Sequence, residues 1–115
     1  MKYALLIYGD EAAYAGATPE QLHGMEEAYG KYAGWLEERG WTRAMERLHD
    51  SGQATTVRAP EGTAITTDGP FAETKEALGG FFVIETADLD EAIEAAAACP
   101  GALTGSIEIR PIADM

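Results

Sequence analysis

Residues 2–9 form an apolar run that carries large side chains on both of its alternating faces. In a strand, the two faces would hold alternate members of this run: Tyr3, Leu5 and Ile7 on one, and Ala4, Leu6 and Tyr8 on the other. A strand with one solvated face alternates apolar and polar residues, so this strand needs cover on both sides. The run Phe81–Ile84, within residues 78–85, predicts a second strand of the same kind.

A helix is predicted over residues 19–39, because its start and stop signals are both present. Thr18 can cap the helix, Pro19 suits its first position, and Gln21 completes a capping box. Gly40 supplies the C-terminal stop. Apolar residues recur every three or four positions, which indicates one buried stripe made of Leu22, Met25, Tyr29, Tyr32 and Leu36.

The rest of the chain predicts a second helix and four more strands. The helix begins after its cap, Asp88, and ends before Pro100. Turn signals separate the strands, which we expect over residues 41–48, 54–59, 63–67 and 106–112, with residues 10–18 as a loop. With the hairpin of residues 54–67 treated as an addition, the order matches a ferredoxin-like βαββαβ fold of the α+β class.

Two helices cover only one face of a four-stranded sheet. The strands at residues 2–9 and 78–85 are apolar on both faces, so the second face would leave a large apolar surface exposed. The simplest cover for such a surface is a second copy of the chain. We therefore expect a homodimer with its sheets packed face to face.

Length and charge narrow the class of protein. The chain has 115 residues, so we treat residues 1–115 as a single domain. Eight Lys and Arg face twenty Asp and Glu, and a formal charge of −12 disfavours nucleic acid and anionic membranes as direct partners. Cys99 is the only cysteine, and the first apolar run is too short for a signal peptide or a membrane span. These features predict a cytoplasmic protein.

A longer motif in the middle of the chain points to a known family. The segment from Thr67 to Glu76 reads Thr-Asp-Gly-Pro-Phe-Ala-Glu-Thr-Lys-Glu, and Leu-Gly-Gly-Phe follows it at residues 78–81. This segment resembles the signature of the YCII-related family, and more narrowly the branch named for its Asp-Gly-Pro-Phe motif. The resemblance spans nearly the whole chain and includes residues 9–11, 54–58, 88–92 and 105–111.

The resemblance implies a dimeric α+β barrel, in agreement with the homodimer expected above. Members of this branch are often encoded beside extracytoplasmic-function sigma factors, which implies a link to their regulation. Other YCII-like proteins are regarded as enzymes that use a His on the first helix and a nearby Asp. In this chain Tyr29 occupies the place of that His, so we do not transfer a His–Asp pair.

Asp68 is the leading candidate for a catalytic group. It precedes Gly69 and Pro70, where the chain must turn sharply. A carboxylate held there at the mouth of a cleft would serve as an acid, a base or a ligand anchor. The favoured alternative is an Asx turn, in which the carboxylate accepts hydrogen bonds from nearby backbone N–H groups.

Further candidates for ligand binding lie on and around the same loop. Phe71 belongs to the motif, and Glu73 and Lys75 would point the same way in an extended chain, where they suit a zwitterionic or anionic small molecule. A surface ion pair is the alternative for these two charges. Arg58 and Arg110 lie on strands and suit a ligand carboxylate, although pairing with one of the many Glu residues is favoured.

Tyr29 is a second candidate for the catalytic machinery, as an orienting hydroxyl in a polar pocket between the first helix and the sheet; its alternative is core packing. The pattern implies no metal site and no cofactor, because His23 and His49 lack metal-ligand spacing and no phosphate-binding loop is present. Two functions stay open. One is a small-molecule-binding protein, with or without catalysis, and the other is a non-catalytic dimeric accessory module.

Overall fold

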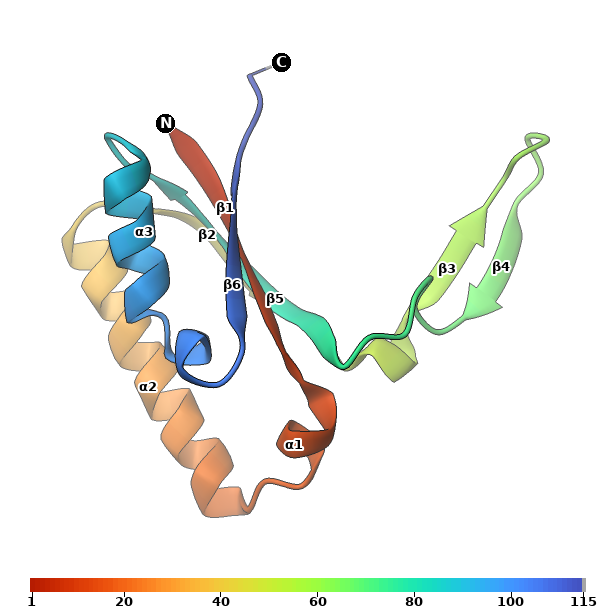
Figure 1. Cartoon of the computed structure of the whole chain (residues 1–115), viewed down its shortest axis with the longest axis horizontal. Coiled ribbons are helices and arrows are strands. Elements are labelled where there is room, and N and C mark those ends of the chain that lie inside the picture. The colour runs from red at the N-terminus through yellow and green to blue at the C-terminus, as the bar shows by residue number, and fades with distance from the viewer. Residues whose placement is uncertain (115) are drawn as a thin grey trace.

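The computed structural model describes residues 1–114 and shows a four-stranded antiparallel sheet with two long helices on one side (Figure 1). Its strands follow the order β2-β5-β1-β6, which is the ferredoxin-like order expected from the sequence. The bounds of these strands are Lys2–Asp10 for β1, Thr42–Arg47 for β2, Glu76–Glu85 for β5 and Ser106–Pro111 for β6.

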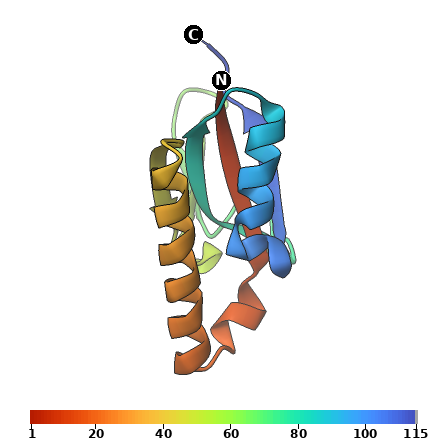
Figure 2. The same ribbon diagram turned by 90° about the vertical axis from the view of Figure 1, so that its left-hand side faces the viewer.

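The two long helices begin and end where their capping residues predict. In α2 (Pro19–Glu38), the Thr18 hydroxyl accepts from Gln21 N at 3.1 Å and the Gln21 side chain accepts from Thr18 N at 2.8 Å. Gly40 follows α2 with a φ of 70°. In α3 (Leu89–Ala98), the Asp88 carboxylate accepts from Glu91 N at 3.0 Å. Figures 1 and 2 show both helices on the same face of the sheet.

The core lies between these helices and the sheet. Tyr3 and Leu5 of β1 and Phe82 and Ile84 of β5 are buried against Tyr32 and Leu36 of α2 and the alanines of α3: Ala92, Ala95 and Ala96. Small side chains on α3 allow the helix to approach the sheet closely. The predicted stripe of α2 is confirmed at its C-terminal half, whereas Met25 near the start of the helix is 38% exposed.

The prediction of a loop over residues 10–18 is wrong at its start. β1 continues to Asp10, and a short helix α1 follows at Glu11–Ala15. The carboxylate of Asp10 caps α1, because it accepts from Ala12 N at 2.9 Å and from Ala13 N at 3.4 Å. Five residues are too few to show a helical period in the sequence, so only the cap could have indicated this helix.

The added hairpin forms a separate two-stranded sheet. Its strands are β3 (Thr55–Arg58) and β4 (Ile65–Asp68), and the two 3₁₀ turns of the chain are η1 (Ser51–Gln53) and η2 (Pro100–Leu103). We call this hairpin the arm, and residues 69–75, which connect it to β5, the arm loop. Figures 1 and 2 place the arm on the side of the main sheet opposite α2 and α3.

The main sheet has an uncovered face on the same side as the arm. Cross-strand partners point to the same face, and the register pairs Leu6 with both Phe81 and Glu108, and Ala4 with both Val83 and Arg110. These residues alternate with the buried Leu5 and Phe82, so they lie on the face without helices, called the open face below. Among residues 1–114, no helix is both long and apolar enough to cross a membrane.

Candidate functional site

The arm and its loop carry five of the seven residues predicted to bind or react: Arg58, Asp68, Phe71, Glu73 and Lys75. All five are exposed. Arg58 ends β3 and Asp68 ends β4, while the other three lie on the arm loop. The strand register puts Asp68 opposite Thr55 at the base of the hairpin and puts Arg58 opposite Ile65 nearer its tip.

The sharp turn after β4 is made by backbone atoms. Gly69 has a φ of 95°, a conformation that residues with a Cβ rarely adopt. Its N–H donates to Ala54 O at 2.6 Å, and its carbonyl accepts from the Thr56 hydroxyl at 2.8 Å. The Asp68 carboxylate accepts no hydrogen bond from the described part of the chain, so the Asx turn is not formed there. Asp68 is therefore free to interact with something outside the chain.

Two cations of this region also lack an internal partner. Within residues 1–114, neither Arg58 nor Lys75 forms an ion pair, so the pairing favoured for Arg58 is wrong and the alternative of a Glu73–Lys75 pair is not formed. By contrast, three of the other arginines are paired with glutamates, at N–O distances between 2.6 and 3.6 Å: Arg39 with Glu94, Arg43 with Glu85, and Arg110 with Glu108. The alternative of ion pairing is thus confirmed for Arg110 and not for Arg58.

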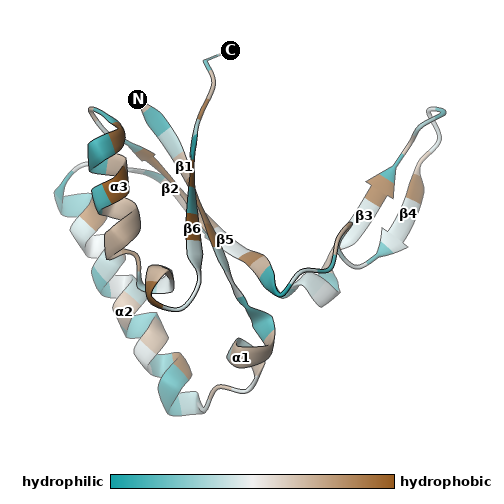
Figure 3. Ribbon diagram, in the orientation of Figure 1, coloured by the Kyte–Doolittle hydropathy of each residue, from teal (hydrophilic) through white to brown (hydrophobic). Residues whose placement is uncertain are grey.

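The arm combines these charges with exposed apolar side chains. Val57 is 58% exposed, Ile65 is 57% exposed and Phe71 is 80% exposed. Figure 3 shows the resulting apolar stretches on β3 and β4, away from the apolar core. Charged groups beside an exposed aromatic ring can recognise a ligand that has both an ionic and an apolar part.

Tyr29 lies elsewhere, between α2 and the turn η2. Its hydroxyl accepts a hydrogen bond from the Cys99 thiol at 3.9 Å, and a Cβ at Gly101 would approach that hydroxyl to 2.7 Å. Burial raises the pKa of Tyr29 far above its ordinary value, and burial likewise raises the pKa of Cys99. Both groups are therefore held neutral. Because α2 and the arm flank opposite sides of the sheet, one chain does not bring Tyr29 and Asp68 into one cleft (Figure 1).

The structure shows a polar cluster on the open face that was not predicted from the sequence. Glu108 and Arg110 share the open face, with 2.6 Å between the Glu108 carboxylate and the Arg110 guanidinium. The hydrogen bond from Arg110 holds the pKa of Glu108 below its ordinary value, with a smaller effect from the Tyr8 hydroxyl. Alternation along residues 106–112 predicts that Glu108 and Arg110 share a face, but placing Tyr8 beside them requires the β1–β6 register.

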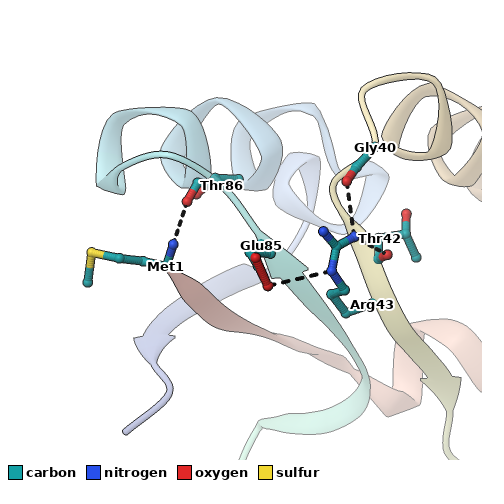
Figure 4. A network of polar contacts seen from close by, with 6 residues as sticks. All are labelled: Met1, Gly40, Thr42, Arg43, Glu85 and Thr86. Atoms are coloured by element: carbon teal, nitrogen blue, oxygen red, sulfur yellow. Dashed lines mark hydrogen bonds and ion pairs between the residues drawn. The ribbon is translucent and has the colours of Figure 1, made fainter. Parts of the chain in front are cut away.

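A second polar network has a structural role, because it connects strands at the end of the main sheet that is remote from the arm (Figure 4). The N-terminal ammonium of Met1 donates to Thr86 O at 2.7 Å. Arg43 donates to Gly40 O at 3.0 Å and to Thr42 O at 2.9 Å, and its guanidinium lies 3.6 Å from the Glu85 carboxylate. These contacts join β1, β2 and β5 at the end opposite the arm.

Two shallow hollows in the surface lie away from the arm. One, of about 380 Å³, lies between α2 and α3 and is lined by Lys31, Tyr32 and Trp35 with two alanines. The other, of about 280 Å³, lies between α3 and β6 and is lined by apolar residues, including Ile93 and Ile107. Neither hollow contains a residue of the arm or of the arm loop.

Comparison with known proteins agrees with the fold and the motif. The profile of the YCII-related domain matches residues 1–115. An uncharacterized protein of Rhizobium meliloti (strain 1021) is 39% identical over 119 residues, an alignment that covers 98% of this chain and 93% of that protein. The profile match and this relative together show that the chain belongs to the YCII-related family.

Proposed function

We propose that the chain is a homodimer that binds a small anionic or zwitterionic molecule at the arm and the arm loop. The observation that carries this proposal is that Arg58 and Lys75 are exposed cations that pair with no acidic group among residues 1–114, although the chain has 20 acidic residues. Guanidinium and ammonium groups in this state suit a carboxylate or phosphate of a ligand. Phe71 supplies an apolar contact for the rest of the molecule.

Asp68 and Glu73 give this site its acidic side. The register of the hairpin puts Arg58 and Asp68 on opposite faces of the arm. A zwitterionic ligand would therefore place its acid group on Lys75 and its amino group on one of these carboxylates. Asp68 is also the group best placed to exchange a proton with such a ligand, because its carboxylate makes no internal hydrogen bond within the described residues. Catalysis therefore requires a ligand whose reacting atom reaches Asp68.

Homodimer formation uses the open face. Leu6, Phe81 and Val83 form an apolar stretch there that α2 and α3 do not cover. Packing two such faces about 10 Å apart would bury them in the manner of a β-sandwich. An isologous interface of this kind closes with two copies.

The binding proposal is tested by thermal unfolding in the presence of benzoate, phenyl phosphate, succinate and glutamate. A ligand at a hundredfold excess over its dissociation constant stabilises the native state by about 2.7 kcal/mol and raises the melting temperature. We expect at least one of these probes to raise it, and we expect Lys75→Ala to abolish the shift. The matched control is Lys31→Ala, which removes one exposed charge from α2, away from the arm.

A second function is favoured by the exposed Val57, Ile65 and Phe71, which also suit contact with a protein partner. In that case the chain would be a non-catalytic accessory module, and a link to sigma-factor regulation belongs to this alternative. The same experiment separates the two. If none of the four probes raises the melting temperature of the wild-type chain, the site proposed for small anions is contradicted and the accessory role is favoured.

A further inference from the structure

We propose that the arm of each copy packs against the body of the other copy, so that the ligand site is complete only in the dimer. This inference rests on the homodimer proposed above, and it specifies which copy supplies each part of the ligand site. One copy supplies Asp68 and Lys75 from its arm and arm loop, and the other copy supplies the surface that encloses them.

The arm is held at its base, where Ser51 donates two hydrogen bonds to the Glu11 carboxylate, but its strands have little further contact with the rest of residues 1–114. Its two strands pack on each other, and neither makes extensive contact with any other helix or strand among residues 1–114. A hairpin of two strands is at best marginally stable in water without a further layer. The arm carries Val57 on one of its faces and Ile65 on the other, each more than half exposed. A stable arm therefore needs an external surface to cover these side chains.

The shape of the whole chain agrees with a missing neighbour. Its radius of gyration is 15.9 Å, whereas a compact chain of this length is expected near 13 Å. The molecule extends 46 × 43 × 18 Å, and the arm accounts for the side of this outline remote from the helices (Figure 1). A projecting segment can pack on a second copy when two protomers exchange an identical element.

The predicted ligand residues lack the concave surroundings that binding sites have. Small-molecule sites bury most of their ligand in a cleft, but Asp68, Phe71 and Lys75 are all exposed on a projecting segment. The two hollows described above are lined by other parts of the chain. If these residues bind a ligand, the facing wall has to come from outside the chain.

A second copy is the occupant that the structure favours. The arm and the open face lie on the same side of the main sheet, so a copy seated on the open face also lies next to the arm (Figures 1 and 2). The charges agree with this placement, because the other copy would carry a formal charge of −12, and Arg58 and Lys75 pair with no acidic group among residues 1–114. Glu46, exposed on β2 and paired in register with Phe81, is one such acidic residue beside the open face.

The test is a photo-crosslink from the arm in a mixed-isotope dimer. The variant Val57→Cys is labelled with benzophenone maleimide, and unlabelled chain is mixed with chain grown on heavy nitrogen before irradiation. The native thiol, Cys99, is buried, so wild-type chain is the control for labelling. Ile65→Cys probes the other face of the arm, and Glu38→Cys at the exposed end of α2 is the control for collisions.

We expect crosslinked peptides that join light and heavy chains from Val57→Cys, from Ile65→Cys or from both, and none from Glu38→Cys. Crosslinks that join only peptides of the same chain, in a sample whose mass in sedimentation is that of a dimer, would overturn the arm's role and leave the proposed dimer standing. A monomeric mass would overturn both. Neither result depends on the four anion probes, which test binding separately.

Discussion

At the scale of single residues, the backbone of Gly69 stabilises the turn in the motif, whereas the side chain of Asp68 takes no part in that turn. Gly69 takes a positive φ, and its N–H and carbonyl both hold the base of the arm through Ala54 and Thr56. Asp68 makes no such contact with the described chain. The sequence indicated a turn at this point, but not which of the two neighbours stabilises it.

Substitutions at these two positions should therefore differ in their effect on stability. Gly69→Ala forces a side chain into the left-handed region and should lower the free energy of unfolding by about 1–2 kcal/mol. Asp68→Ala should change it by less than about 0.5 kcal/mol, since no internal hydrogen bond is lost. Urea unfolding followed by circular dichroism measures both. A loss of more than about 1 kcal/mol for Asp68→Ala would mean that the Asp68 side chain stabilises the fold.

The buried thiol and phenols predict a loss of stability in alkali. Burial raises the pKa of Cys99, Tyr29 and Tyr32 in the folded chain above their ordinary values of 9.0 and 10.0. Above those values the unfolded chain releases protons that the folded chain retains, so unfolding becomes more favourable. The stabilisation should be complete below pH 9 and fall as the pH rises through 9.0 and 10.0.

Urea unfolding between pH 8 and pH 11, a range set about the ordinary Cys and Tyr pKa values, measures this fall. In the Cys99→Ala variant, the free energy of unfolding should still decrease with pH as far as the tyrosines cause the decrease. In the Tyr32→Phe variant, the decrease with pH should be smaller than in wild type. Tyr32→Phe should also cost about 1 kcal/mol at neutral pH, because the Tyr32 hydroxyl donates to Ala95 O at 2.7 Å in the core. A stability that stays flat across the whole range would contradict the burial of these groups.

At the scale of elements, caps and periodicity predicted the two long helices and the four strands of the main sheet. Strong local signals, such as the capping box at Thr18 and the stop at Gly40, gave bounds within about one residue of those observed. Helix α1 was missed because it is shorter than two turns. The sequence also did not predict that the arm would lie apart from the main sheet. Hairpin signals indicate that β3 and β4 pair with each other, but they do not indicate which surface the pair packs against.

The cap of α2 gives a prediction at this scale. Thr18→Ala removes the hydrogen bond from Gln21 N and breaks the capping box, so the free energy of unfolding should fall by about 1 kcal/mol. Thr104→Ala is the matched control, because Thr104 is exposed and its hydroxyl makes no hydrogen bond to the described residues. Equal stability of the two variants in urea unfolding would show that this cap contributes nothing.

At the scale of the whole molecule, the chain leaves two surfaces uncovered on one side of its sheet. Double-faced strands in the sequence predicted the open face, because Leu6 and Phe81 alternate with buried neighbours. The arm could not be anticipated as a second uncovered surface, since its position depends on long-range packing. The sequence likewise allowed surface glutamates as partners for Arg58 and Lys75. In the folded chain these two cations lie on the arm and the arm loop, where they form no ion pair within residues 1–114.

The proposed homodimer and the proposed role of the arm both require that a second copy buries the open face, and sedimentation equilibrium at micromolar concentration tests this directly. Wild type should have twice the chain mass of 12.3 kDa. Phe81→Glu should sediment as a monomer with unchanged circular dichroism, whereas Leu103→Glu, at a site that is 89% exposed, should remain dimeric. A wild-type mass of 12.3 kDa throughout the range, or a Phe81→Glu variant that remains dimeric, would contradict the proposed dimer.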